Sequence, residues 1–158
     1  MAFTPLEVKA IALAYVALAD GEAGSEEKAV IFSILGKHVR SEHLTPDTLK
    51  VLAQKAFAFA KQYDFNTFLE KAGGVLSPGQ QMSVLLNMYD IMLADGQIAA
   101  GEKKMIDLFR RRFDIDDAAM TAFRQILILK NDAAMFTNPD HPCNEPNFKM
   151  DIRVGGSE

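Results

Sequence analysis

Four carboxylate side chains stand at matching places in two stretches of the chain. Asp20 follows an apolar stretch and Glu27 lies seven positions later, and the same separation recurs between Asp95 and Glu102. Carboxylate oxygens are hard ligands that suit Ca²⁺, Mg²⁺ or Mn²⁺, whereas Zn²⁺ prefers His or Cys, which neither stretch contains. Folding back of the chain at each loop would bring its two acids together, and if the two units pack about a local two-fold axis, all four acids line one surface. The pattern therefore predicts a divalent-cation site formed by Asp20, Glu27, Asp95 and Glu102.

The same acids also have a purely structural interpretation. The glycine after each aspartate, Gly21 or Gly96, is an ordinary helix stop. A glutamate in the first turn of a helix faces the positive end of the helix dipole. An EF-hand is excluded, because the loops lack its alternating Asp/Asn ligands and are too short for that arrangement. Residue types alone therefore leave cation binding and helix termination both open.

An internal repeat carries these acids. Leu18-Ala19-Asp20-Gly21 aligns with Leu93-Ala94-Asp95-Gly96 at an offset of 75, and the match extends from Glu27-Lys28 to Glu102-Lys103. Each unit is predicted to be an apolar helix, a loop that begins with Asp-Gly, and a second helix with an early glutamate. Helix ends alone do not require four residue types to recur in one register. We therefore expect two related units that pack about a local two-fold axis.

Apolar residues at helical spacing predict helices throughout and no strand. Capping boxes with proline at the first helical position start two of them, at Thr4-Pro5-Leu6-Glu7 and Ser77-Pro78-Gly79-Gln80. The first helix is apolar nearly all round, so it is expected to lie centrally. The predicted fold is all-α, a bundle of about seven helices with a pseudo-two-fold repeat. Four helices are expected at about 5–19, 25–38, 78–94 and 101–113. A third helix in chain order starts at Thr45-Pro46, a short fourth runs from Asp64 or Asn66 to Gly73-Gly74, and a seventh is capped by Asp116.

Composition is that of a single globular domain. The chain has 158 residues, of which 49% are hydrophobic and 24% are charged, as in one ordinary domain. It holds 17 Lys and Arg against 21 Asp and Glu, a net charge of −4, without a basic tail. We therefore expect no nucleic-acid partner. The single cysteine, Cys143, allows no intramolecular disulfide and fits a reducing cytoplasm.

The longest apolar run, residues 10–19, is about half of the roughly 20 residues that a membrane-spanning helix needs. It imitates a secretory signal, but Glu7 offsets Lys9 before it, and a similar helix recurs in mid-chain. We interpret the run as a helix of the mature protein. The expected location is cytoplasmic, without direct membrane insertion.

The character of the chain changes at about Thr137, where three prolines fall within eight residues: Pro139, Pro142 and Pro146. They exclude a helix there. Apolar and polar residues then alternate at Phe148, Met150, Ile152 and Val154, as in a short extended segment laid on the helices or on a partner. We predict a helical domain over 1–136 and a proline-rich tail over 137–158 that is loosely docked or disordered.

Other candidate sites are weaker. His38 and His43 are interpreted as surface residues of a polar linker. His141 and Cys143 stand too close and too isolated for a metal site or a catalytic pair, and Cys143 is expected to be a free, exposed thiol. Arg110-Arg111-Arg112 point to different helix faces, which favours a solvated surface over a phosphate site. The sequence has no Gly-rich phosphate loop and no nucleophile elbow.

The paired motifs resemble those of the tellurite-resistance TerB-like family. The resemblance rests on Ala19-Asp20-Gly21 with Glu27-Lys28 and on Ala94-Asp95-Gly96 with Glu102-Lys103, and it covers about residues 4–136. It implies an all-helical, pseudo-symmetric bacterial domain tied to tellurite resistance and other stress responses. It also implies metal chelation at Asp20, Glu27, Asp95 and Glu102. The second loop departs by having Gln97 and Gly101 where the first has Glu22 and Glu26, so two equal sites are not expected.

Two functions follow from these patterns. The first is a non-enzymatic domain that binds a divalent cation or a protein partner through its acidic loops, with the partner, as the resemblance implies, in a membrane-associated resistance complex. The alternative is a scaffold protein without a metal site. Catalysis ranks last, because paired catalytic carboxylates need a dry cleft and helix-end loops are expected to be wet. A homodimer is left open.

Overall fold

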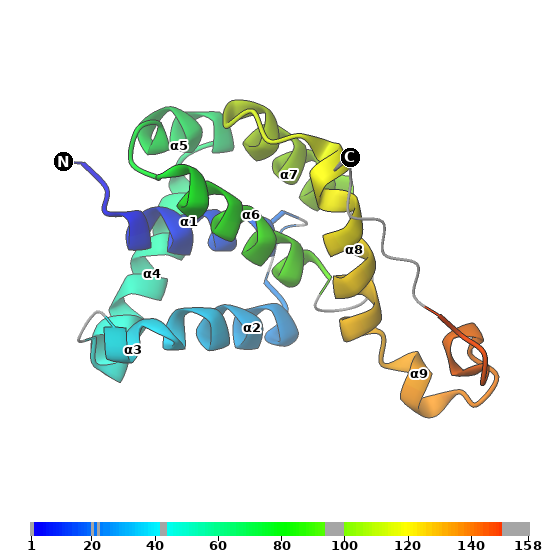
Figure 1. The fold of residues 1–158 in the computed structure, drawn as a ribbon. Coiled ribbons are helices and arrows are strands. Elements are labelled where there is room, and N and C mark those ends of the chain that lie inside the picture. The colour runs from blue at the N-terminus through cyan, green and yellow to red at the C-terminus, as the bar shows by residue number, and fades with distance from the viewer. Residues whose placement is uncertain (1, 20, 22, 42–43, 94–99, 150–158) are drawn as a thin grey trace.

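The computed structural model describes residues 2–19, 21, 23–41, 44–93 and 100–149, which form helices and no strand (Figure 1). Seven of these helices have eight residues or more: α1 (Pro5–Ala17), α2 (Ser25–Gly36), α4 (Pro46–Gln62), α5 (Phe65–Ala72), α6 (Pro78–Met92), α7 (Ala100–Arg112) and α8 (Asp117–Asn131). Shorter elements are α3 (His38–Ser41), α9 (Ala134–Thr137) and a 3₁₀ turn at Pro142–Asn144. The predicted all-α fold class is confirmed.

Local hydrogen bonds set where the helices begin. In α1 the Thr4 hydroxyl accepts from the Glu7 amide at 3.2 Å, and the Glu7 carboxylate accepts from the Thr4 amide at 2.8 Å. Ser77 and Gln80 make the same reciprocal pair at the start of α6, at 3.2 and 2.9 Å. Both capping boxes predicted from the sequence are therefore confirmed.

Helices α1 and α6 end two residues earlier than their apolar patterns suggest. Their C-cap residues, Leu18 and Leu93, adopt almost the same conformation, with φ of −95° in both and ψ of 3° and 5°. Gly21 follows with φ of +116°, a value that L side chains rarely adopt. The backbone therefore adopts at Gly21 a conformation that favours glycine.

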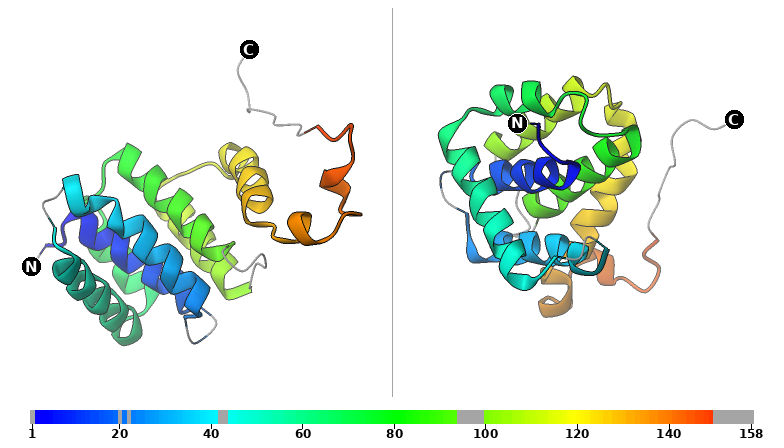
Figure 2. Two further views of the ribbon diagram at one scale, coloured as in Figure 1. Left: turned by 90° about the horizontal axis from the view of Figure 1, so that it is seen from below. Right: turned by 90° about the vertical axis from the view of Figure 1, so that its left-hand side faces the viewer.

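Helix α1 runs through the centre of the bundle, as its all-round apolar sequence predicts (Figure 2). Helices α4 and α6 make its most extensive contacts, and α2 and α7 also pack against it. Nine of its thirteen residues are buried: Val8 and the continuous run 10–17. Helix α2 contacts α6 as well as α1, and α7 contacts α1 as well as α6. The local two-fold axis itself remains a prediction.

An aromatic cluster closes the bundle beside the C-terminal half of α1. The Tyr15 ring lies 5.1 Å from Phe65 and 5.3 Å from Phe68, and Phe68 is fully buried. The Tyr15 hydroxyl donates to the carbonyl oxygens of Tyr63, at 2.6 Å, and Asp64, at 3.1 Å. Burial, with a smaller contribution from the nearby Asp64 charge, raises the pKa of Tyr15 to about 12. This end of the core is therefore tied to the α4–α5 connection.

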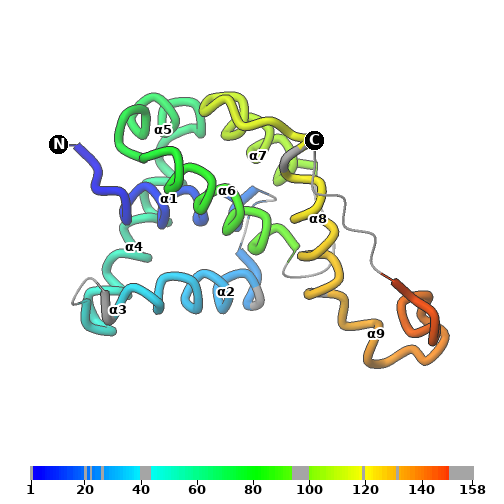
Figure 3. The backbone as a smooth tube through the Cα atoms, in the orientation of Figure 1, coloured from blue at the N-terminus to red at the C-terminus, as the bar shows by residue number. Residues whose placement is uncertain are grey.

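Helix α8 packs on α6, and the elements after it lie apart from the other helices (Figures 1 and 3). Against the expectation that residues after 137 contain no helix, a 3₁₀ turn forms at Pro142–Asn144. Proline fits its first position because no backbone N–H is needed there. His141 holds the turn through Asp132, at 2.8 Å, and through the Cys143 amide. The tail from Met150 onward lies outside the described residues, so its docking remains a prediction.

Candidate functional site

Glu27 and Glu102 are the two charged side chains that are buried in the part of the chain the structure describes. They are 7% and 2% exposed. Each occupies the third position of its helix, Glu27 in α2 and Glu102 in α7. The expectation that these loop acids are wet is therefore wrong for both glutamates, because the first turns of α2 and α7 pack into the bundle.

Glu27 has a defined hydrogen bond at the start of α2. Its Oε2 accepts from the Gly24 amide at 2.6 Å. This is one half of a capping box, since Gly24 has no side chain to return the bond. The carboxylate thus satisfies one of the backbone donors that every helix N-terminus leaves open. This bond supports the interpretation of Glu27 as a residue that stabilises the start of its helix.

The first turn of α7 closely approaches the backbone just after α1. A Cβ atom at position 101 would lie 2.9 Å from the carbonyl oxygen of Ala19. Only glycine leaves room for this contact. The first turn of α7, with Glu102, therefore lies against the residue that precedes Asp20. The departure from glutamate at position 101 has a packing reason, because a larger side chain would collide with the backbone of Ala19.

The predicted four-acid set is described only in part. Asp20 and Asp95 lie outside the described residues, as do Glu22 and Gln97. Over the residues that are described, no group of three or more His, Cys, Asp or Glu side chains is arranged to hold a metal ion. Glu27 and Glu102 do not by themselves form such a group. The cation site thus remains a prediction whose two glutamates are placed and whose aspartates are not.

A second polar feature is a cleft of about 610 Å³ between α6, α7 and the start of α8. Five charged side chains line it: Lys103, Asp107, Arg110, Asp117 and Arg124. The other lining residues are Tyr89, Met92 and Ile106, which are buried. Lys103 is the lysine of the repeated Glu-Lys motif. The residue that follows buried Glu102 in the chain therefore lines this cleft.

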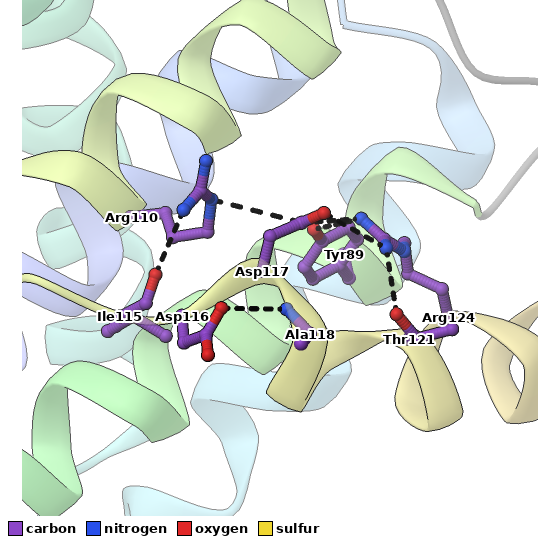
Figure 4. A network of polar contacts seen from close by, with 8 residues as sticks. All are labelled: Tyr89, Arg110, Ile115, Asp116, Asp117, Ala118, Thr121 and Arg124. Carbon is purple, nitrogen blue, oxygen red and sulfur yellow. Dashed lines mark hydrogen bonds and ion pairs between the residues drawn. The ribbon is translucent and has the colours of Figure 1, made fainter. Parts of the chain in front are cut away.

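Two arginines converge on Asp117 at this cleft (Figure 4). Arg124 donates from Nη1 to Asp117 Oδ1 at 2.8 Å and from Nη2 to Oδ2 at 3.4 Å. Arg110 approaches the same carboxylate with Nε 3.8 Å from Oδ1, and its Nη1 donates to the Ile115 carbonyl at 3.1 Å. The Arg124 hydrogen bond lowers the pKa of Asp117 despite an opposing effect of partial burial.

Sequence reasoning missed this cluster. The three consecutive arginines do point to different faces, as predicted: Arg111 is exposed, and Arg112 lies 5.9 Å from the Phe113 ring centre. The solvated interpretation is wrong for Arg110, whose side chain is 20% exposed. The seven-residue spacing of Asp117 and Arg124, two turns along one helix, is a signal that could have found half of the cluster.

A larger groove of about 830 Å³ lies between the α1–α2 connection, α2 and α4. Most of its lining residues are apolar or small, and its described charged side chains are Lys28 and Lys61. The other lining residues are Leu18, Gly21, Ala23, Phe32, Ala53, Gln54, Phe57 and Ala58. Lys28 is the lysine of the first Glu-Lys motif. Each copy of the motif thus contributes one buried glutamate and one lysine at the edge of a cavity.

The histidines have local partners. Lys9 Nζ lies 2.9 Å from His38 Nε2, and burial, aided by the charge of Lys37, lowers the pKa of Lys9. His141 accepts the Cys143 amide at Nδ1, which leaves Nε2 to donate to Asp132. Cys143 is a free thiol but only partly exposed. His43 lies outside the described residues.

Fold and site together define an all-helical domain in which two helices carry a buried glutamate in their first turn, directly after a loop. The family model of tellurite resistance protein TerB matches residues 7–125, and the chain belongs to this family. No curated protein and no solved structure was found to match it. Among the described residues, every helix is too short or too polar to cross a membrane.

Proposed function

We propose that the chain is a non-enzymatic domain of a bacterial tellurite-resistance or stress-response system that binds a divalent cation at its acidic loops. Glu27 and Glu102 would hold the ion together with Asp20 and Asp95. The observation that supports this most directly is the burial of both glutamates, at 7% and 2% exposure, in a chain whose other described charged side chains reach solvent.

Burial of a carboxylate needs electrostatic compensation. Moving an ionised group out of water costs roughly several kcal/mol per ion unless hydrogen bonds or an opposite charge replace its hydration. Helix N-termini supply part of this at both glutamates. A divalent ion shared with the loop aspartates would supply more, and Ca²⁺, Mg²⁺ and Mn²⁺ all favour such oxygen ligands.

The two loops are not equivalent in charge. The first contains Glu22 and Glu26, whereas Gln97 and Gly101 take those places in the second. Since affinity for Ca²⁺-like ions rises with the number of charged ligands, the proposal includes one stronger site, at the first loop. The same acids would attract a basic surface of a protein partner, which we expect within a membrane-associated resistance complex.

A scaffold function is the second candidate. The 2.6 Å bond from the Gly24 amide to Glu27 favours it, because this bond gives the carboxylate a role in starting α2 without any ion. On that interpretation Glu27 and Glu102 only stabilise helix N-termini.

Thermal unfolding with and without Ca²⁺, Mg²⁺ or Mn²⁺ separates the two functions. We expect saturating cation, at about 100 times Kd, to add about 2.7 kcal/mol to the stability, or about 5 to 10 °C in Tm. The double variant Glu27→Gln with Glu102→Gln should lose this increment. Glutamine retains an oxygen that accepts the Gly24 amide, so the helix start survives.

Glu7→Gln is the matched control. Glu7 holds the same position in α1 and accepts the Thr4 amide at 2.8 Å, but it lies outside both loops. This variant should keep the full cation increment. A wild-type Tm unchanged by all three cations, or an increment that survives in the double variant, would overturn the proposal and leave the scaffold function.

A further inference from the structure

The cleft between α6, α7 and α8 concentrates positive charge in an acidic protein. The chain carries a net charge of −4, yet three cations, Lys103, Arg110 and Arg124, line this one cleft with two carboxylates, Asp107 and Asp117. The arginines come from different helices, Arg110 from α7 and Arg124 from α8. The concentration is therefore created by the packing of α8 against the second unit.

Asp117 occupies the position that an external anion would take. Both arginines face it, at 2.8 Å for Arg124 Nη1 and 3.8 Å for Arg110 Nε (Figure 4). The latter distance is too long for a hydrogen bond, and Arg110 Nε, although buried, has no hydrogen-bond partner among the described residues. The Asp117 side chain is 48% exposed, so it can rotate toward solvent without disturbing the core.

The charge that Asp117 leaves behind defines the ligand. With its carboxylate turned away, three cations and one carboxylate, Asp107, remain at the cleft, so its net charge is +2. This balance matches a dianion better than a carboxylate. Paired guanidinium groups recognise phosphate oxygens through forked hydrogen bonds. Apolar side chains also line the cleft, among them Met92 and Ile106, which are 3% and 1% exposed.

We propose that this cleft binds a dianionic phosphate group, with Arg110 and Arg124 taking its oxygens in place of Asp117 and Lys103 at the rim. The phosphate is either the free ion or the head of a monoester whose apolar part lies against Met92 and Ile106. This site is separate from the acidic loops, so its test does not depend on the proposed cation.

The test is an NMR titration of the full chain with inorganic phosphate and with phenyl phosphate, at constant ionic strength and at pH 8, where both are dianions. We expect the Arg110 Nε–H resonance to shift with each probe. Tighter binding of phenyl phosphate identifies a monoester with an apolar group as the ligand, and equal binding identifies the free ion. Absence of any saturable shift at Arg110 and Arg124 with both probes would overturn the proposal.

Three variants distinguish a built site from general charge attraction. Arg110→Gln should weaken binding about tenfold, the loss expected for one charged hydrogen bond, whereas Arg111→Gln, its exposed neighbour with the same charge change, should leave affinity unchanged. Lys103→Gln at the exposed rim should weaken binding less, with no effect on folding. Equal weakening by Arg110→Gln and Arg111→Gln would contradict the proposal.

Asp117→Asn gives a change of the opposite sign. Removal of the internal competitor should raise the affinity for phosphate several-fold, although the same substitution breaks an ion pair of the native fold. A purely structural network predicts no gain. Weaker or unchanged phosphate binding in a folded Asp117→Asn protein would therefore also overturn the proposal.

Discussion

The two cavities that carry the repeated lysines differ in character. Lys28 stands at a groove in which α4 supplies alanines, Phe57, Gln54 and Lys61. Lys103 stands at a cleft in which α8 supplies Asp117 and Arg124. The sequence repeat covers the helices that carry the lysines, whereas the covering helices, α4 and α8, lie outside it. The two repeated units therefore place their lysines alike, and the side chains of α4 and α8 determine the chemical character of each cavity.

Two tyrosines on the central helices show the same contrast. Tyr15 of α1 donates to two backbone carbonyls and stands among aromatic rings. Tyr89 of α6 has a single described hydrogen bond, from Arg124 Nη1 at 3.5 Å. Burial raises the pKa of Tyr89 as well, but the Arg124 charge opposes the change. Aromatic rings therefore surround the tyrosine of the first unit, whereas charged side chains at a cleft surround the tyrosine of the second.

The largest expected effect comes from opening the aromatic cluster. Phe68→Ala should lower the free energy of unfolding by about 3 to 5 kcal/mol, because a fully buried ring is replaced by a cavity. Phe32→Ala is the control in the same half, since Phe32 is 43% exposed at the groove; we expect it to cost less than about 1 kcal/mol. Urea unfolding followed by circular dichroism measures both. Similar losses for the two variants would contradict the claim that the aromatic cluster closes this end of the core.

An intermediate effect separates the tyrosines. Tyr15→Phe should cost about 0.5 to 1.5 kcal/mol, because it removes the hydrogen bonds that tie α1 to the carbonyl groups of Tyr63 and Asp64. Tyr89→Phe should cost less than about 0.5 kcal/mol, since it removes one hydrogen bond of 3.5 Å, which is long and therefore weak. The same urea measurement applies. Equal costs would contradict the contrast between the aromatic surroundings of Tyr15 and the charged surroundings of Tyr89.

The smallest effect is the stability contribution of the Asp117 ion pair. Its side chain is 48% exposed, so solvent screening limits the contribution at neutral pH to about 0 to 1 kcal/mol. Because the folded-state pKa of Asp117 is lowered, this stability is present above the unfolded value near about 4 and is lost as pH falls through the folded value. Asp117→Asn should therefore differ from wild type at pH 7 and converge with it near pH 2. A difference that grows in acid would contradict this assignment.

Helix starts were predictable because they depend on bonds that span only three residues. Thr4 with Glu7 and Ser77 with Gln80 are visible as sequence motifs and form as expected. The ends of α1 and α6 were misplaced by two residues, since Leu18 and Leu93 continue the apolar pattern after the helical backbone has ended.

The candidate sites were predictable only in part. Glu27 and Glu102 stand out through the repeat, but their burial depends on packing between helices, which the sequence does not display. Gly101 looked like a lost acid and is instead a contact with Ala19. The convergence of Arg110 and Arg124 on Asp117 joins α7 to α8, so no single helical pattern contains it.

The central claim is that the acidic loops bind a divalent cation. A crystal structure grown with Mn²⁺, read through the anomalous signal of the ion, tests it most directly. The account predicts an anomalous peak within coordination distance of Glu27 or Glu102 and of at least one of Asp20 and Asp95. A structure in which Glu27 still accepts the Gly24 amide, and in which the loops show no peak at saturating Mn²⁺, would contradict it.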